Sequence, residues 1–159
     1  MRGGVEARGR LVAVMNEMGS MASKTFAERD LSIVADLRFL RDAREWAASV
    51  AGDFGLNGEH CFQIKLAMSE AVANAIQHGS RAPEDPVHIS ARERGGALVF
   101  EVRDTGVFRQ RNGPAEEMAE RGRGLGLVAL VMDEVELEPG ENGSLLRFTK
   151  RLEADAPRS

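Results

Sequence analysis

The run Ser69-Glu-Ala-Val-Ala-Asn-Ala-Ile-Gln-His-Gly79 places a polar residue at every fourth position of a largely apolar segment. Because an α-helix turns once every 3.6 residues, Glu70, Asn74 and His78 share one helix face. A buried polar group without a partner costs about 1 kcal/mol or more, so three in a row favour a lined cavity; a solvent-facing stripe is the alternative. The amide oxygen of Asn74 suits Mg²⁺, and Glu70 can accept a proton from a hydroxyl or water. His78 taken alone fits a cation near the helix C-terminus better than a ligand.

The residues around this run predict a long helix over residues 58–78, capped by Asn57 and ended at Gly79. Its apolar residues cover much of the helix circumference, so most of the helix should be buried. Before it, the spacing of apolar residues predicts an amphipathic helix over residues 35–50, and alternation predicts a strand over residues 28–34.

Alternating and turn patterns downstream predict a hairpin, a polar loop, a short helix and a final strand pair. The strands are expected at residues 87–92, 97–103, 135–138 and 144–150, the hairpin turn at Gly95-Gly96, the loop at 108–121 and the helix at 125–132. This order predicts an α+β fold. We expect a two-layer sandwich in which a mixed, mainly antiparallel sheet is covered on one face by helices.

Length and composition restrict the class of protein. The 159 residues fit one domain, expected over residues 26–152, with residues 153–159 as a tail. Residues 1–25 have no sustained period and are expected to be a disordered tail or start-site residues, with a basic arm for a partner as the alternative. The net charge of -4 argues against direct nucleic-acid binding, and the single Cys61 excludes a disulfide scaffold. No apolar run is long enough to span a membrane.

Two short segments lie at the ends of expected strands. Asp104-Thr-Gly106 follows the strand of residues 97–103. Its carboxylate can accept a base amino group while Gly106 lets the backbone stay close, although a simple Asp-Gly turn is the plainer interpretation. Gly143-Ser144 enters the last strand and by itself indicates only a turn.

A glycine-rich segment, Gly122-Arg-Gly124-Leu-Gly126, opens the expected helix at residues 125–132. Glycines let backbone amides approach an anion, and a flexible lid without a ligand is the alternative. The segment is neither a Walker loop nor a good dinucleotide fingerprint, because the required lysine and the preceding strand are missing. Arg121 and Arg123 could reach phosphate oxygens, or could be solvated charges.

Taken in order, these four segments resemble the N, G1, G2 and G3 boxes of the Bergerat-fold (GHKL) ATPase superfamily. The runs Ser69 to Gly79 and Gly124 to Val135 look most like one branch, the bacterial anti-sigma-factor serine/threonine kinases of sporulation and general stress response. The resemblance covers about residues 26–152. One position departs from the pattern, because Phe108 stands where the G1 box usually has its second glycine. A bulky residue there would narrow the pocket or shift the loop.

The resemblance implies a role for each matching residue. Glu70 would be the catalytic base or polarising carboxylate, and Asn74 the Mg²⁺ ligand. Asp104 would bind the adenine amino group beside Gly106, and Ser144 would stand where a threonine is common. The remaining nucleotide-binding positions implied are His78, Arg121, Gly122, Arg123, Gly124, Leu125 and Gly126.

The resemblance also implies a function. The chain would transfer the γ-phosphate of ATP, with Mg²⁺, to an anti-sigma-antagonist protein of the STAS type, and would sequester a sigma factor in the cytoplasm. A homodimer is expected through the first strand and helix, whose apolar residues include Leu31, Ile33, Phe39 and Trp46. Two alternatives stay open: a nucleotide-binding switch without kinase activity, and a histidine-kinase-type ATPase module. The second is disfavoured because His60 stands on the buried helix, a poor place for a phosphoacceptor.

Overall fold

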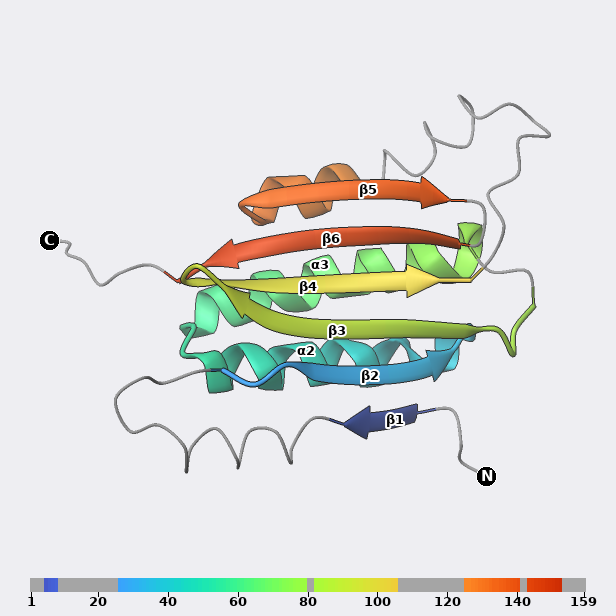
Figure 1. The fold of residues 1–159 in the computed structure, drawn as a ribbon, viewed down its shortest axis with the longest axis horizontal. Helices are drawn as coiled ribbons and strands as arrows, with labels where there is room; N and C mark the ends of the chain where they lie inside the picture. The colour runs from blue at the N-terminus through green and yellow to red at the C-terminus, as the bar shows by residue number, and fades with distance from the viewer. Residues whose placement is uncertain (1–4, 9–25, 80–81, 106–124, 141–142, 153–159) are drawn as a thin grey trace, which may run out of the picture.

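Six strands form a single sheet in the order β1-β2-β3-β4-β6-β5 in the computed structural model (Figure 1). The structure describes residues 5–8, 26–79, 82–105, 125–140 and 143–152. The strands are β1 (Val5–Arg8), β2 (Arg29–Val34), β3 (Pro86–Arg94), β4 (Ala97–Asp104), β5 (Glu134–Gly140) and β6 (Gly143–Arg151). Every pair of neighbouring strands among them is antiparallel. The predicted α+β fold is confirmed, and the expected mixture of strand directions is not found among the described strands.

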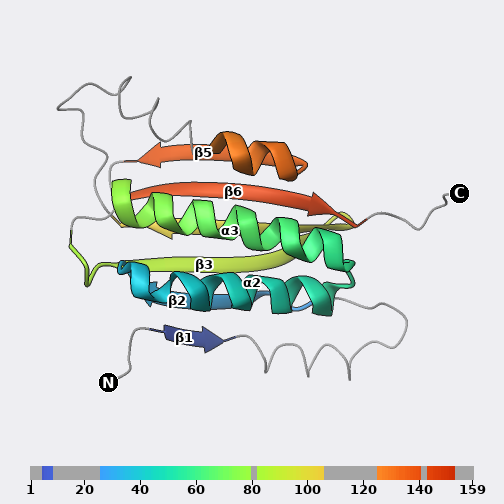
Figure 2. The ribbon, with the colours of Figure 1, turned by 180° about the vertical axis from the view of Figure 1, so that it is seen from behind.

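Two long helices cover one face of this sheet. They are α2 (Leu40–Phe54), which follows the short 3-10 helix η1 (Leu37–Phe39), and α3 (Gly58–His78). Both lie behind the sheet in Figure 1 and in front of it in Figure 2. Residues 125–131 are also helical and lie on the same side of the sheet (Figure 2). No helix within these described segments combines the length and apolarity needed to cross a bilayer.

The ends of α2 and α3 follow local chemistry. Gly55 ends α2 with a φ of 109°, a left-handed conformation that glycine adopts without strain. Asn57 caps α3, because its side chain accepts a hydrogen bond from the His60 amide at 2.8 Å. The predicted cap at Asn57 and the predicted end of the helix at Gly79 are therefore confirmed.

The core lies between the helices and the sheet. Phe100 of β4 and Phe148 of β6 stack with ring centroids 5.4 Å apart, and Trp46 of α2 meets Phe100 edge to face. From α3, the fully buried side chains are those of Ile64, Ala67, Met68, Ala71 and Val72. Burial of the larger of these side chains, Ile64, Met68 and Val72, stabilises a fold by about 1.5–3 kcal/mol each, so α3 is held firmly on the sheet.

The hairpin between β3 and β4 decides which side chains of β4 face the helices. Gly95 and Gly96 have φ values of 58° and 81°, which suit a two-residue hairpin turn, and Arg94 pairs with Ala97. Since side chains alternate along a strand, this register turns Leu98, Phe100, Val102 and Asp104 toward the helices. Asp104 is thus the last residue of an otherwise apolar row.

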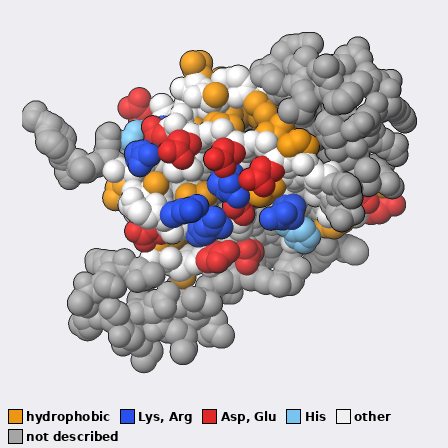
Figure 3. All heavy atoms as spheres, turned by 45° about the horizontal axis from the view of Figure 1, so that its top comes forward, with side chains coloured by type: hydrophobic (Ala, Val, Ile, Leu, Met, Phe, Trp, Pro, Cys, Tyr) orange, Lys and Arg blue, Asp and Glu red, His pale blue; other side chains and the backbone are white. Residues whose placement is uncertain are grey.

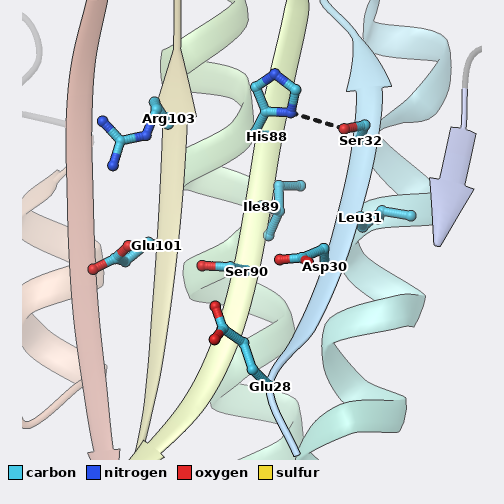
Figure 4. Close-up of a pocket in the computed structure, with 9 residues that line it drawn as sticks. All are labelled: Glu28, Asp30, Leu31, Ser32, His88, Ile89, Ser90, Glu101 and Arg103. Atoms are coloured by element: carbon cyan, nitrogen blue, oxygen red, sulfur yellow. Dashed lines mark hydrogen bonds between the residues drawn. The ribbon is translucent and has the colours of Figure 1, made fainter. Parts of the chain in front are cut away.

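The other face of the sheet carries charged side chains of both signs, side by side (Figure 3). Glu101 pairs with Arg147 at 2.9 Å and with Arg92 at 3.3 Å, and Arg147 also pairs with Glu136 at 2.5 Å. A groove of about 340 Å³ crosses β2, β3 and β4 there, where the Ser32 hydroxyl and His88 Nδ1 lie 2.8 Å apart (Figure 4). We call this side of the sheet the open face.

One expectation about the chain termini needs correction. Residues 5–8 lie within the segment expected to be a tail, yet they form β1 and pair with β2, Val5 opposite Ile33. Val5 to Arg8 alternate apolar and polar residues, but four residues are too short for a secure strand signal, and an edge strand is held by main-chain hydrogen bonds to its neighbour. Residues 1–4, 9–25 and 153–159 of the expected tails lie outside the described residues.

Candidate functional site

Three elements meet at one end of the sheet: the end of α3, the end of β4 and the start of β6. Because β4 and β6 are antiparallel neighbours, the last residue of one lies beside the first residues of the other. The Ser144 amide donates to Asp104 Oδ1 at 3.0 Å, and the Ser144 hydroxyl donates to Asp104 Oδ2 at 2.8 Å. Two residues 40 positions apart in the chain thus form one hydrogen-bonded pair.

This pair is buried. Asp104 is 4% exposed and Ser144 is 6% exposed. A buried carboxylate needs hydrogen-bond donors to offset its lost hydration, and Ser144 supplies two of them. A carboxylate has about four acceptor positions, so two bonds from Ser144 are compatible with a further donor such as a base amino group.

Glu70 and Asn74 lie on α3, in the helix turns that precede Gly79, the residue next to this pair. Both side chains are half-buried, whereas Ala71 and Ala75 beside them are buried and Gln77 is exposed. They therefore stand at the border between the sheet-facing and solvent-facing sides of the helix. His78 is the last residue of α3, and its side chain lies outside the description.

Gln63 belongs to the same helix face and was not expected there. It stands seven residues before Glu70, about two helix turns, so the two side chains project in nearly the same direction. Its Oε1 atom is buried and has no hydrogen-bond partner, the one such side-chain atom among the described residues. The heptad spacing from Glu70 is the signal that could have pointed to it.

The C-terminal end of the helix of residues 125–131 is hydrogen-bonded to β6. The ammonium of Lys150, a residue only 6% exposed, donates to the carbonyl oxygen of Val131 at 2.6 Å. The Asp133 amide donates to the carbonyl of Thr149 at 2.9 Å. At the other end of the helix Leu125 is half-buried and Gly126 is exposed. The role of Lys150 was not predicted, because a lysine near a strand end is usually exposed.

Several residues expected at the site cannot be placed. Gly106, Phe108, Arg121, Gly122, Arg123 and Gly124 lie outside the described residues. The described part of the site therefore consists of the Asp104–Ser144 pair, Gly79 beside it, Glu70 and Asn74 on α3, and the helix that begins near Gly126.

These residues fit a nucleotide and a magnesium ion. The described residues hold no group of three His, Cys, Asp or Glu side chains able to bind a metal by themselves. Magnesium in phosphate-binding sites is commonly held by few protein oxygens together with phosphates, and Asn74 offers one such oxygen. The buried carboxylate of Asp104 can accept a hydrogen bond from the amino group of a nucleotide base, whereas the amide oxygen of Asn74 suits the metal ion. The two ends of the site therefore differ in chemistry.

Comparison with known proteins finds matches over most of the chain. A family model described as the histidine kinase-like ATPase domain matches residues 33–150, which include Glu70, Asn74, Asp104 and Ser144. The Serine-protein kinase RsbW of Oceanobacillus iheyensis is 27% identical over 137 residues, covering 77% of this chain and 85% of its own length. The protein of the same name from Bacillus pumilus is 28% identical over 139 residues, with 77% and 85% covered.

A solved structure shares the fold. It contains the RsbU and RsbW domains of a Mycobacterium tuberculosis protein and superposes with a TM-score of 0.62 at 22% identity. The match covers 82% of this chain and 34% of that one, so the chain corresponds to about a third of the solved protein.

Proposed function

Because the chain belongs to the histidine kinase-like ATPase domain family, we propose that it transfers the γ-phosphate of ATP to a serine or threonine of an anti-sigma-antagonist protein and sequesters a sigma factor. The resemblance to the anti-sigma-factor kinase branch is confirmed by the family match and by relatives named serine-protein kinases. The same relatives support the enzyme class, a protein serine/threonine kinase. The acceptor, the sigma factor and the residue roles are the proposal.

The observation that carries the proposal is the buried Asp104–Ser144 pair at the end of α3. In our proposal Asp104 accepts a hydrogen bond from the adenine amino group, and Ser144 holds the carboxylate in place. In the same proposal Gly106 would stand beside the ring, and His78 would contribute to nucleotide binding. The rest of the nucleotide then runs along α3 past Asn74 toward Glu70.

In the reaction, a serine or threonine hydroxyl of the acceptor attacks the γ-phosphorus. Its oxygen forms the new bond to phosphorus, the bond to the β–γ bridging oxygen breaks to leave ADP, and the hydroxyl proton passes to Glu70. Asn74 would hold Mg²⁺ together with phosphate oxygens, and the bound ion would neutralise charge on the triphosphate.

The segment before the helix of residues 125–131 supplies the remaining contacts of the proposal. The amides of Gly122, Gly124, Leu125 and Gly126 hold phosphate oxygens, and Arg121 and Arg123 add positive charge. Most of the rate enhancement then comes from positioning and electrostatic stabilisation rather than from covalent chemistry.

The proposed setting is a cytoplasmic homodimer. Part of the apolar surface that was expected to be available for a dimer interface is buried within the chain itself, because Leu31 and Ile33 are core residues. Phe39 and Trp46 are half-buried against the core, while Leu37 is 50% exposed. The dimer therefore rests chiefly on the family resemblance. Light scattering that shows only monomers at tens of micromolar protein would argue against it.

The test of the kinase compares two variants on one helix face. Glu70→Gln is nearly isosteric and should keep nucleotide binding while lowering phosphotransfer by roughly 10²–10⁴-fold, the usual contribution of a positioned base. Asn74→Ala removes a metal ligand, so Mg²⁺-dependent nucleotide affinity and transfer should fall together. The measurements are radiolabel transfer from ATP to the antagonist and calorimetric nucleotide affinity.

Each outcome separates the candidates. A general packing defect would harm both variants alike. Wild-type protein that binds ATP yet labels no antagonist from its own cell would favour the switch without kinase activity. Equal transfer by Glu70→Gln and wild type would remove Glu70 from the mechanism, and absence of ATP binding would remove the site.

A further inference from the structure

We propose that Gly79 is a specificity-determining position: the missing side chain leaves the space in which the Asp104 carboxylate stands, and so sets the preference for a base that carries an amino group. The inference rests on the proposed nucleotide site. Gly79 acts through Asp104 and is a positioning residue, with no contact of its own to the base required.

The close approach is seen when a Cβ atom is placed on Gly79. It would overlap all three heavy atoms of the Asp104 carboxylate, with Oδ2 and Cγ nearest and Oδ1 at 2.8 Å. Contacts this short are essentially never made by real Cβ atoms, so one of the two residues would have to move. The end of α3 and the end of β4 can therefore touch only because residue 79 lacks a side chain.

Backbone conformation does not explain this glycine. Gly79 has φ of -107° and ψ of -7°, a negative-φ conformation that is allowed for L-amino acids. Gly55, at the end of α2, has φ of 109° and needs the left-handed freedom of glycine. The two helices thus end in glycines for different reasons, and the reason at Gly79 is room for the carboxylate.

The carboxylate has little freedom to move aside. Both of its oxygens accept hydrogen bonds from Ser144, at 3.0 and 2.8 Å, and the residue is 4% exposed. The main chain is confined as well, because a Cβ on Gly143 would overlap the carbonyl oxygen of Asp104. A methyl group at position 79 would push the carboxylate away from Ser144 and from its direction toward the base.

The consequence for the ligand is a change in base discrimination. Adenine presents an amino group, which donates to a carboxylate, whereas hypoxanthine presents a carbonyl oxygen at the same position and cannot donate. A site built around a well-placed acceptor rejects the analogue that leaves the acceptor unpaired. The ratio of ITP to ATP dissociation constants therefore reports the placement of Asp104 directly.

The experiment measures the affinities of ATP and ITP by calorimetry in the full-length chain, for wild type, Gly79→Ala and Gly58→Ala. Gly58 is the matched control, since it lies on the same helix and a Cβ there meets nothing within 4 Å. We expect wild type and Gly58→Ala to prefer ATP by about tenfold or more, and Gly79→Ala to lose most of that preference. An unchanged ratio in Gly79→Ala, or equal affinities in wild type, would overturn the inference.

A second measurement covers the case in which Gly79→Ala folds poorly. Asp104→Ala removes the atoms that clash with the new methyl group, so the double variant should unfold at the temperature of Asp104→Ala alone. A further drop in unfolding temperature in the double variant would contradict the steric coupling. Failure of wild type to bind either nucleotide would count against the proposed function itself, which distinguishes the two failures.

Discussion

Asp104 and Glu101 lie three residues apart on β4, on opposite faces of the sheet, and they show how differently the two faces use a carboxylate. Glu101, on the open face, has a 14% exposed side chain and ion pairs with Arg92 and Arg147. Asp104, on the side covered by helices, is held by the neutral amide and hydroxyl of Ser144. Glu101 is thus held among cations on the open face, whereas the hydrogen bonds from Ser144 fix Asp104 at the end of the sheet where three elements meet.

The difference extends to the other polar groups. On the open face they are many and share partners, as Arg147 does with Glu101, Glu136 and Glu138. Such partly exposed pairs contribute about 0–1 kcal/mol each. On the covered side, two buried groups among the described residues join separate elements: Ser144 joins β6 to β4, and Lys150 joins β6 to the helix of residues 125–131. Loss of a covered polar group should therefore matter more than loss of an open one.

The largest effect is expected at Asp104. Asp104→Asn should weaken ATP binding by about one to two orders of magnitude, because a hydrogen bond to a charged group contributes about 1.5–3 kcal/mol. Glu101→Gln, the matched change on the open face of the same strand, should leave the affinity unchanged. Calorimetry with ATP and Mg²⁺ measures both. Equal losses in the two variants would mean that the two faces do not differ in function.

A smaller effect is expected at Lys150. Lys150→Met keeps most of the length of the side chain but leaves the Val131 carbonyl without its donor, so the free energy of unfolding should fall by about 1–2 kcal/mol. The control is Lys65→Met, which removes the partly exposed Lys65–Glu45 pair at 3.4 Å and should change stability by less than about 1 kcal/mol. Urea unfolding measures both changes. A larger loss in Lys65→Met would reverse the comparison.

The elements of the fold could be predicted because their signals are local. The periodicity of α3, the Asn57 cap and the Gly95-Gly96 turn each depend on neighbouring residues, and all three are found. Strand β1 was not predicted, since the alternation of Val5 to Arg8 spans only four residues and the pairing with β2 is a long-range main-chain contact.

The site was predicted as residue types, and its contacts were not. Asp104 and Ser144 were each expected at a nucleotide, yet their bond depends on the register between β4 and β6. The close approach of the Asp104 carboxylate to Gly79 likewise could not be predicted, because a glycine that follows a helix indicates only an ordinary C-terminal cap. Gln63 and Lys150 were missed because burial decides their roles, and these residue types are usually exposed.

Gln63 is the exception on the covered side, because its buried Oε1 atom has no partner. If the atom serves no ligand, Gln63→Met should raise the free energy of unfolding by about 1 kcal/mol, since an unsatisfied buried group is replaced by an apolar one of similar shape. Urea unfolding measures the change, and phosphotransfer is measured beside it. Lower stability would contradict the prediction, and higher stability with reduced transfer would add Gln63 to the site.

The smallest effect is expected at Asp36, a partly exposed carboxylate that caps η1. The backbone amide of Arg38 donates to it at 2.9 Å and the Arg38 guanidinium at 3.2 Å, and these bonds lower the pKa of Asp36 below its usual 3.8. Because the folded pKa lies below the unfolded one, this contribution to stability is present above pH 3.8 and is lost as the pH falls through the folded pKa.

Asp36→Asn keeps an oxygen that can accept from the Arg38 amide but removes the charge. The variant should therefore be slightly less stable than wild type at neutral pH, and the difference should vanish in acid well below pH 3.8. Urea unfolding at the two pH values measures it. A difference that persists undiminished in acid would mean that the charge of Asp36 is not its source. A difference as large as that for Lys150→Met would mean that partly exposed polar groups do not contribute less to the free energy of unfolding than covered ones.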